Sequence, residues 1–239
     1  LEVTVPTLAP GTVEVVVTVG GQASAAVQFD VVSVRLPSII AVLPDTGTVG
    51  ASVGVRGSNF GSTQGTSTVT FAGVDAGAAT AWTGSMLTVQ VPAGATSGDV
   101  VVTVAGVASN ARSFWVVEPT LSSIQAGVFT RRCATASCHE SASSPPLATD
   151  CPPGSVTRNL DLRAGMSFAS LVGPGGIDSC EMPGRLRVQA GSRATSYLFD
   201  KISSATTPRG MQMPANSVAL PADVIDIIGT WIDNGAPNN

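Results

Sequence analysis

The residues best suited to chemistry lie close together in the second half of the chain. Cys133, Cys138 and His139 form a C-x4-C-H pattern. Two thiols can add to the vinyl groups of a porphyrin while the adjacent imidazole binds the iron, which is how c-type haem is attached. The usual spacing has two residues between the cysteines, so four is a departure. His139 is the only histidine in the chain, so it is the only candidate imidazole ligand and a Ser/His/Asp triad would have to use it.

Two other kinds of site are open to the same three residues. Cys133 and Cys138 could form a disulfide across a short loop, which would leave His139 as an ordinary surface residue. Alternatively, both thiolates and the imidazole could bind zinc. A tetrahedral zinc site needs a fourth ligand that the sequence does not identify, and an oxidising compartment disfavours free thiolates.

The overall composition favours a folded chain rich in β-structure. Of the 239 residues, 44% are hydrophobic and 12% are charged, and there are 26 glycines and 16 prolines. The apolar content argues against a disordered chain, and the frequent turn-forming residues argue against a helical bundle. A net charge of −4 with scattered basic residues makes nucleic acid an unsuitable partner. No run of about 18 uncharged apolar residues occurs, so no membrane span is expected.

The first half shows the alternation of short antiparallel strands. Apolar residues occupy every second position, with turns rich in Gly, Pro, Ser and Thr between the runs, as at Val13, Val15, Val17 and Val19 and at Leu87, Val89 and Val91. Strands of this kind bury one face and expose the other, which predicts an antiparallel sandwich.

An internal repeat divides this half. Residues 1–6 match residues 87–92 with an offset of 86 (87 − 1), and residues 15–19 match residues 100–104 with an offset of 85 (100 − 15). Phe29 then pairs with Phe114. Residues 1–33 are therefore interpreted as the C-terminal half of a unit whose complete copy spans 37–117.

The complete copy resembles an IPT/TIG domain, an immunoglobulin-like sandwich common in cell-surface proteins. The resemblance is carried by five segments: 37–40, 50–61 (with Gly-Ser-Asn-Phe-Gly at 57–61), 69–73, 87–92 and 98–106. We expect Gly57 and Gly61 to adopt backbone angles that a Cβ would forbid, and Phe60 to close the end of the sandwich. The family implies a spacer or adhesive module.

Half a sandwich would expose apolar faces and unpaired strand edges. Two explanations are open for residues 1–33. Either further residues precede Leu1 in the native protein, or strands from a neighbouring subunit complete the fold and build a polymer by strand addition.

From about Leu121 the apolar spacing becomes helical. We expect a first helix capped by Ser122 or Ser123 and extending to Arg132, a second over 164–172, a third over 196–203, and a last one from Pro221 that is stopped by Gly235. Four short helices in about 120 residues make a small core, so this part needs a staple or a cofactor.

Residues 121–237 resemble a class I cytochrome c domain, of a monohaem type in secreted bacterial proteins where C-x4-C-H variants occur. The matches are Phe129-Thr130, Leu160-Asp161-Leu162, Ser196-Tyr197-Leu198, Met213-Pro214 and the final run 231–237. The overall fold class expected is therefore multidomain, an all-β Ig-like sandwich followed by an all-α cytochrome c-like domain over 121–239.

The resemblance implies one haem c, covalently attached through Cys133 and Cys138, with His139 as the proximal iron ligand. The distal ligand implied is Met213, with Met211 as the fallback; Met182 also precedes a proline but lies beside a cysteine expected to form a disulfide.

Two further expectations come from the same resemblance. The first and last helices should cross with Gly127 under Trp231. The insertion between His139 and Leu160 leaves the carbonyl that accepts the His139 ring proton undetermined, and we place it near Pro145 and Pro146.

The cysteines at 151 and 180 are most simply a disulfide, which fits an oxidising compartment. Tyr197 and Arg187 are candidate neighbours of the haem propionates.

The function expected is extracytoplasmic electron transfer by a haem with His/Met axial ligation, displayed on Ig-like modules. The location would be the periplasm, the cell surface or the medium, and the partner a redox protein or neighbouring subunits. The alternative is a structural surface fibre or adhesin, possibly polymeric, whose C-terminal domain is stabilised by the cofactor. A haem sensor or a peroxidase-like enzyme would need an open iron position.

Overall fold

The computed structural model describes residues 11–31, 35–135, 138–140, 160–203, 210–215 and 218–239. These residues belong to two compact units, one within residues 1–36 and one comprising 37–239. Each unit is described by itself below. Strands predominate over helices, and no helix in the described ranges combines the length and apolar character needed to cross a lipid bilayer.

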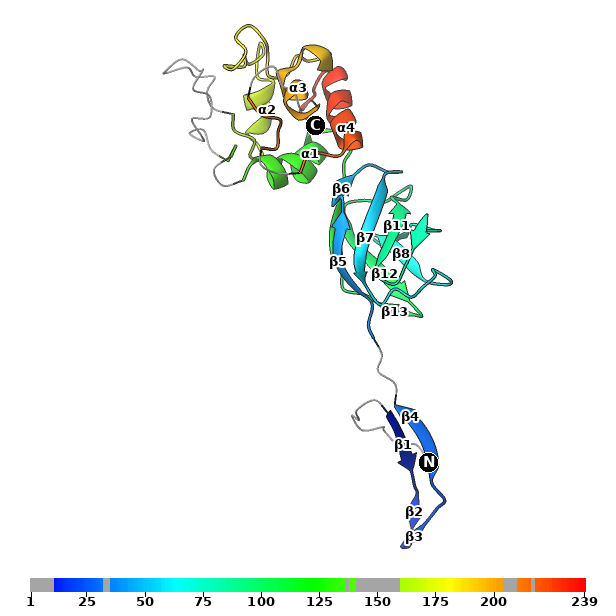
Figure 1. Ribbon diagram of the computed structural model, residues 1–239. Helices are drawn as coiled ribbons and strands as arrows, with labels where there is room; N and C mark the ends of the chain where they lie inside the picture. The colour runs from blue at the N-terminus through cyan, green and yellow to red at the C-terminus, as the bar shows by residue number, and fades with distance from the viewer. Residues whose placement is uncertain (1–10, 32–34, 136–137, 141–159, 204–209, 216–217) are drawn as a thin grey trace. The chain divides into compact units, whose positions relative to one another are not determined.

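Residues 38–116 form a sandwich of two sheets (Figure 1). One sheet has the order β10-β11-β7-β5, and the other has the order β6-β14-β12-β8-β9 with β13 paired to β12. The strands are β5 Ser38–Leu43, β6 Thr46–Gly47, β7 Ser52–Ser58, β8 Thr68–Phe71, β9 Val74–Asp75, β10 Ala81–Trp82, β11 Met86–Gln90, β12 Gly98–Val104, β13 Val107–Ala108 and β14 Arg112–Val116. Neighbouring strands of the sandwich pair antiparallel, except β14 with β6, which are parallel.

The alternation seen in the sequence determines which side chains fill this sandwich. Val53 and Val55 on β7 are fully buried while the residues between and around them are not. The core continues through the facing strands, with Phe60, Val69, Phe71, Leu87, Val89, Val100, Val102 and Phe114. The expected Ig-like sandwich is confirmed.

The turn around Phe60 shows two different uses of glycine. Gly61 has a φ of +81°, as expected for a residue that must adopt the left-handed region. Gly57 does not have a positive φ. A Cβ there would instead lie 2.0 Å from the Ser38 carbonyl oxygen and 2.3 Å from Cζ of Phe60. The expectation for Gly57 was therefore wrong in its reason: the position needs space for the ring of Phe60, which is fully buried.

The first unit contains a β-hairpin with the register of the last hairpin of the sandwich. Its strands are β1 Gly11–Val15, β2 Thr18–Val19, β3 Gln22–Ala23 and β4 Val27–Val31. Val13 pairs with Phe29 as Gly98 pairs with Phe114, and Thr18 pairs with Ala23 as Thr103 pairs with Ala108. Each of these four positions is offset by 85 residues, for example 98 − 13 and 114 − 29.

The second half of the 37–239 unit is helical. Its elements are α1 Leu121–Ile124, the π-helix η1 Gln125–Cys133, α2 Ser167–Leu171, the 3-10 helix η3 Arg193–Thr195, α3 Tyr197–Ser203 and α4 Ala222–Asp233 (Figure 1). The first helix is capped by Thr120, whose hydroxyl accepts from the Ser123 amide at 3.2 Å, and not by Ser122 or Ser123. Helix α4 buries Val224, Ile228, Trp231 and Ile232, the helical spacing visible in the sequence.

The helices share a core that begins at the end of the sandwich. Val117 follows β14 and is 2% exposed, packed in one cluster with Ile124, Val128 and Trp231. The side chain of Asp223 accepts hydrogen bonds from the amide and the hydroxyl of Thr48, at 2.8 and 3.0 Å. Helix α4 is thus bonded to the sandwich at its first turn, in addition to its apolar contacts.

Candidate functional site

Helix η1 and the loop after it bring the C-x4-C-H residues to one place. The helix ends at Cys133, where the Ala134 amide donates to the Phe129 carbonyl at 2.7 Å. The chain then turns back, because the His139 amide donates to the Cys133 carbonyl at 2.9 Å. The two extra residues between the cysteines therefore do not carry His139 away from the first cysteine. Residues 136 and 137 of this loop lie outside the described residues.

The ring of His139 is oriented by a backbone carbonyl. Its Nδ1 lies 3.2 Å from the carbonyl oxygen of Leu160, and the carbonyl of His139 accepts from the Leu162 amide at 2.9 Å. Our placement of the acceptor near Pro145 and Pro146 was wrong; those residues lie outside the described ranges. A ring that donates from Nδ1 leaves Nε2 with its lone pair, which is the form that binds a metal.

Burial lowers the pKa of His139, and the charges of Arg187 and Lys201 lower it further, against the opposing effects of the Leu160 carbonyl and Glu181. The imidazole is therefore neutral near pH 7.

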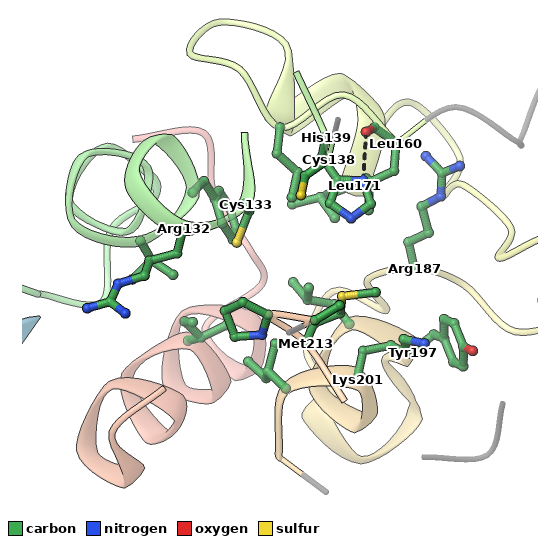
Figure 2. A pocket seen from close by; sticks show the side chains of 18 of the residues that line it. Arg132, Cys133, Cys138, His139, Leu160, Leu171, Arg187, Tyr197, Lys201 and Met213 are labelled. Carbon is green, nitrogen blue, oxygen red and sulfur yellow. Dashed lines mark hydrogen bonds between the residues drawn. The ribbon is translucent and has the colours of Figure 1, made fainter. Parts of the chain in front are cut away.

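A cavity of about 170 Å³ lies at the centre of the helical half. Cys133, Cys138, His139 and Met213 all line it, so the four expected haem-site residues are brought together. Figure 2 shows the His139 ring and the Met213 thioether on opposite walls and pointing toward one another. The rest of the lining is largely apolar and includes Val128, Phe129, Leu160, Leu162, Leu171, Leu198, Ile202, Leu220 and Ile228.

Met213 is held at the cavity by its backbone. Its amide donates to the Lys201 carbonyl at 2.7 Å, which ties the loop to α3. Met211, the fallback ligand, is 58% exposed and is absent from the cavity lining, and so is Met182. Of the three methionines considered, the structure places Met213 opposite His139.

The two thiols are free, so the alternative of a disulfide between Cys133 and Cys138 was wrong. Burial raises the pKa of Cys133 to about 12, with a further contribution from Cys138. The Cys133 thiol is therefore protonated at neutral pH, which does not suit a zinc thiolate. Within the described residues, no three His, Cys, Asp or Glu side chains are grouped to hold a metal ion.

Cys180 is disulfide-bonded and also lines the cavity. Its expected partner, Cys151, lies outside the described residues, so the 151–180 pairing stays a prediction.

Three charged side chains and a tyrosine gather on one part of the cavity wall. Arg187, Tyr197, Lys201 and Glu181 all line it. The Tyr197 hydroxyl donates to Glu181 at 2.5 Å, and Lys201 lies 3.3 Å from the same carboxylate oxygen. Arg187 donates to the Ser170 carbonyl at 2.7 Å, and burial lowers its pKa. The sequence had singled out Tyr197 and Arg187, but Glu181 and Lys201 were missed because they belong to no motif.

An ion-pair cluster holds η1 against the sandwich. Asp45 accepts from Arg131 at 2.8 Å and also from Arg132, and the Arg131 guanidinium lies 5.1 Å from the ring centroid of Trp115. Partial burial would raise the pKa of Asp45, but hydrogen bonds and charges from the two arginines outweigh it and hold the pKa below 3.8. Sequence reasoning missed Asp45, which lies 86 residues from Arg131.

Gly127 serves the same junction. Among the nearest atoms to a Cβ at this position are Cγ2 of Val117 at 2.9 Å and Oγ1 of Thr46 at 3.7 Å. The lack of a side chain therefore lets η1 approach the sandwich, and the contact of Gly127 with Trp231 stays a prediction. Trp231 is fully buried, and its indole NH donates to the Pro237 carbonyl at 3.0 Å.

Comparison with known proteins bears on the sandwich. The model of the IPT/TIG domain family matches residues 37–115. Residues 37–115 form an IPT/TIG domain. The match ends before the cavity, and no curated protein matches the chain.

Three solved structures illustrate the further similarities. An auxiliary nutrient binding protein from Bacteroides thetaiotaomicron is 26% identical with a TM-score of 0.33, over 35% of this chain and 21% of that one. The gamma-CGTase from Alkalophilic bacillus clarkii is 30% identical with a TM-score of 0.32, over 41% and 14%. SGBP-B from Bacteroides uniformis is 22% identical with a TM-score of 0.30, over 40% and 28%. This chain thus spans less than a third of each of these proteins.

Proposed function

We propose that residues 121–239 hold one haem c, attached through Cys133 and Cys138 and ligated by His139 and Met213, and that the protein carries single electrons outside the cytoplasm. The observation that carries the proposal is the opposition of a neutral imidazole and a thioether across one apolar cavity, with two free thiols in its wall.

The side chains that line the cavity fit haem c better than they fit a zinc ion. Thioether sulfur is a soft ligand that suits haem iron opposite a histidine, and apolar walls suit a porphyrin face. Both thiols are free to form thioethers, and burial keeps the Cys133 thiol protonated at neutral pH. When bound, the haem supplies a one-electron couple between ferrous and ferric iron, and a Met/His ligand pair raises its potential.

The chain's own residues would perform three tasks. The Leu160 carbonyl orients the His139 ring and favours the tautomer with a free Nε2. The bond from the Met213 amide to Lys201 fixes the loop that carries the thioether. The apolar lining excludes water, while Arg187 and Lys201 supply positive charge at the part of the wall where carboxylates of a porphyrin could be accommodated.

The rest of the molecule fits display in an oxidising compartment. A disulfide at Cys180 and an IPT/TIG domain both support a periplasmic, cell-surface or extracellular location. The partner would be a redox protein or a neighbouring subunit, and neither nucleic acid nor a membrane span enters the proposal.

The decisive experiment is to produce the protein in a bacterial periplasm together with a haem c maturation system, and to measure its mass after denaturation. The expected result is the chain plus one haem, with a pyridine haemochrome spectrum of two thioether bonds. Cys133→Ser and Cys138→Ser should each give the spectrum of a single thioether, and the double variant should lose haem on denaturation. An unmodified mass, while a known cytochrome is matured in the same cells, would refute the proposal.

A structural fibre or adhesin is the second candidate, and it is favoured by the IPT/TIG domain together with a second hairpin of the same register, as expected for an array of spacer modules. Two readouts separate the two functions. An electron carrier should be reduced and reoxidised by small mediators in proportion to its haem content. A purely structural protein should assemble equally well without haem.

A further inference from the structure

The hairpin of residues 11–31 presents three side chains that are buried at the equivalent positions of the IPT/TIG domain. With the offset of 85, Val15, Val17 and Phe29 correspond to Val100, Val102 and Phe114, which are identical in type. Their exposed fractions are 46%, 44% and 44%, against 0%, 0% and 1% for the counterparts. The two hairpins agree in register, so the difference lies in what covers them.

The cover of the second hairpin is known in detail. The ring of Phe114 packs edge-on against Phe71, with centroids 5.2 Å apart. The same core includes Val53, Val55, Leu87 and Val89 from the covering strands. An apolar layer of this composition and spacing would fit Val15, Val17 and Phe29 equally well, because the residues to be covered are the same.

A second copy of this chain does not have such a layer to offer. Its strands β7 and β11 are already covered by its own hairpin, and β8 is already paired with β12, as the near-zero exposure of Val100, Val102 and Phe114 shows. The sequence points to a different source. Residues 1–6 match residues 87–92, which include most of β11, so the chain just before the hairpin already follows the order of a complete unit.

We propose that residues 11–31 are the closing hairpin of another IPT/TIG sandwich, covered by a segment of the type of residues 37–86 that precedes them in the same full-length polypeptide. The docking surface is the face formed by Val15, Val17 and Phe29. This inference is independent of the haem site.

The repeat itself provides the test. Because Leu1 corresponds to Leu87, a copy of residues 37–86 fused directly before Leu1 rebuilds a complete unit at the natural spacing. We expect hydrogen exchange of the β4 amides to slow at least about a hundredfold relative to the 239-residue chain, at every protein concentration. The 37–115 domain of the same molecule serves as the internal reference for folding.

Two neighbouring residues on opposite faces of β4 give the matched variants. Phe29→Ala in the fusion should abolish the added protection, because the ring would fill the new core. Gln28→Ala should retain it, because the side chain at 28 faces away from that core and its counterpart Ser113 is exposed.

Three results would overturn the proposal. One is a fusion in which the 37–115 domain is folded but β4 stays unprotected. Another is protection of β4 in the 239-residue chain that grows with concentration, since a second copy would then be the cover. The third concerns protein isolated from its native source: if its β4 amides exchange as fast as those of the 239-residue chain, the proposal fails even if the fusion does not fold.

Discussion

Met213 and Met211 are two positions apart but have different surroundings, which makes them a matched pair. Met213 lines the cavity opposite His139, and Met211 is 58% exposed. We expect Met213→Ala to leave the haem covalently attached but to open one axial position. The reduced variant should then bind carbon monoxide, which visible absorption spectroscopy detects.

Met211→Ala should behave as the unmodified protein in the same titration. The variant Met213→His replaces the thioether by a second imidazole instead of removing the ligand. It should therefore lower the midpoint potential without allowing carbon monoxide to bind. If unmodified protein already binds carbon monoxide readily, or if Met211→Ala is the variant that does, the assignment of Met213 is wrong.

At the scale of elements, the turn after β7 depends on the absence of a side chain at one position. A Cβ on residue 57 would lie 2.0 Å from a backbone oxygen and 2.3 Å from the ring of Phe60. The ring cannot move freely, since Phe60 is fully buried and its carbonyl accepts from the Trp82 indole at 3.0 Å. The oxygen belongs to Ser38 on β5, which is paired with β7. Gly57→Ala should lower the free energy of unfolding of the IPT/TIG domain by about 3 kcal/mol, measured by urea denaturation.

Gly54 on the same strand is the control. A Cβ there would meet only the Leu43 carbonyl oxygen at 3.4 Å, an ordinary contact. Gly54→Ala should therefore change the free energy of unfolding by less than about 1 kcal/mol. Equal losses for both variants would show that β7 tolerates no side chain at either site, and that the crowding around Phe60 is not the cause.

At the scale of the whole 37–239 unit, Asp45 joins the sandwich to the helix that ends at Cys133. Its pKa is below 3.8 in the folded protein, so the pair stabilises the fold above that pH and the contribution is lost as the pH falls through the folded pKa. Asp45→Asn should therefore lower stability at pH 7 by about 1 kcal/mol, because solvent screens a partly exposed pair. The difference should disappear as the pH falls through the folded pKa of Asp45.

Thermal unfolding of the two proteins at pH 7 and at low pH measures this effect. Glu14→Gln, a change of an exposed carboxylate in the other compact unit, should leave the unfolding of residues 37–239 unchanged at both pH values. A loss of stability in Asp45→Asn that persisted at low pH would assign the role of Asp45 to packing and not to its charge.

Much of the fold could be predicted because its signals are local. Alternating valines and glycine-rich turns predicted the sandwich, and the spacing of Val224, Ile228 and Trp231 predicted the last helix. The candidate site was also predicted in part, since Cys133, Cys138 and His139 are close in sequence and Met213 precedes a proline. These features depend on backbone geometry and on neighbours a few residues away, which a single sequence displays directly.

The partners of those residues came from tertiary structure alone. The acceptor for His139 is Leu160, the anchor of η1 is Asp45, and the space at Gly127 is taken by Val117. Each contact joins segments that only packing brings together, and the chain has no local pattern that encodes it. The sequence by itself determined which elements form and which side chains can react; the folded chain decided which carbonyl, carboxylate and methyl group lies beside each of them.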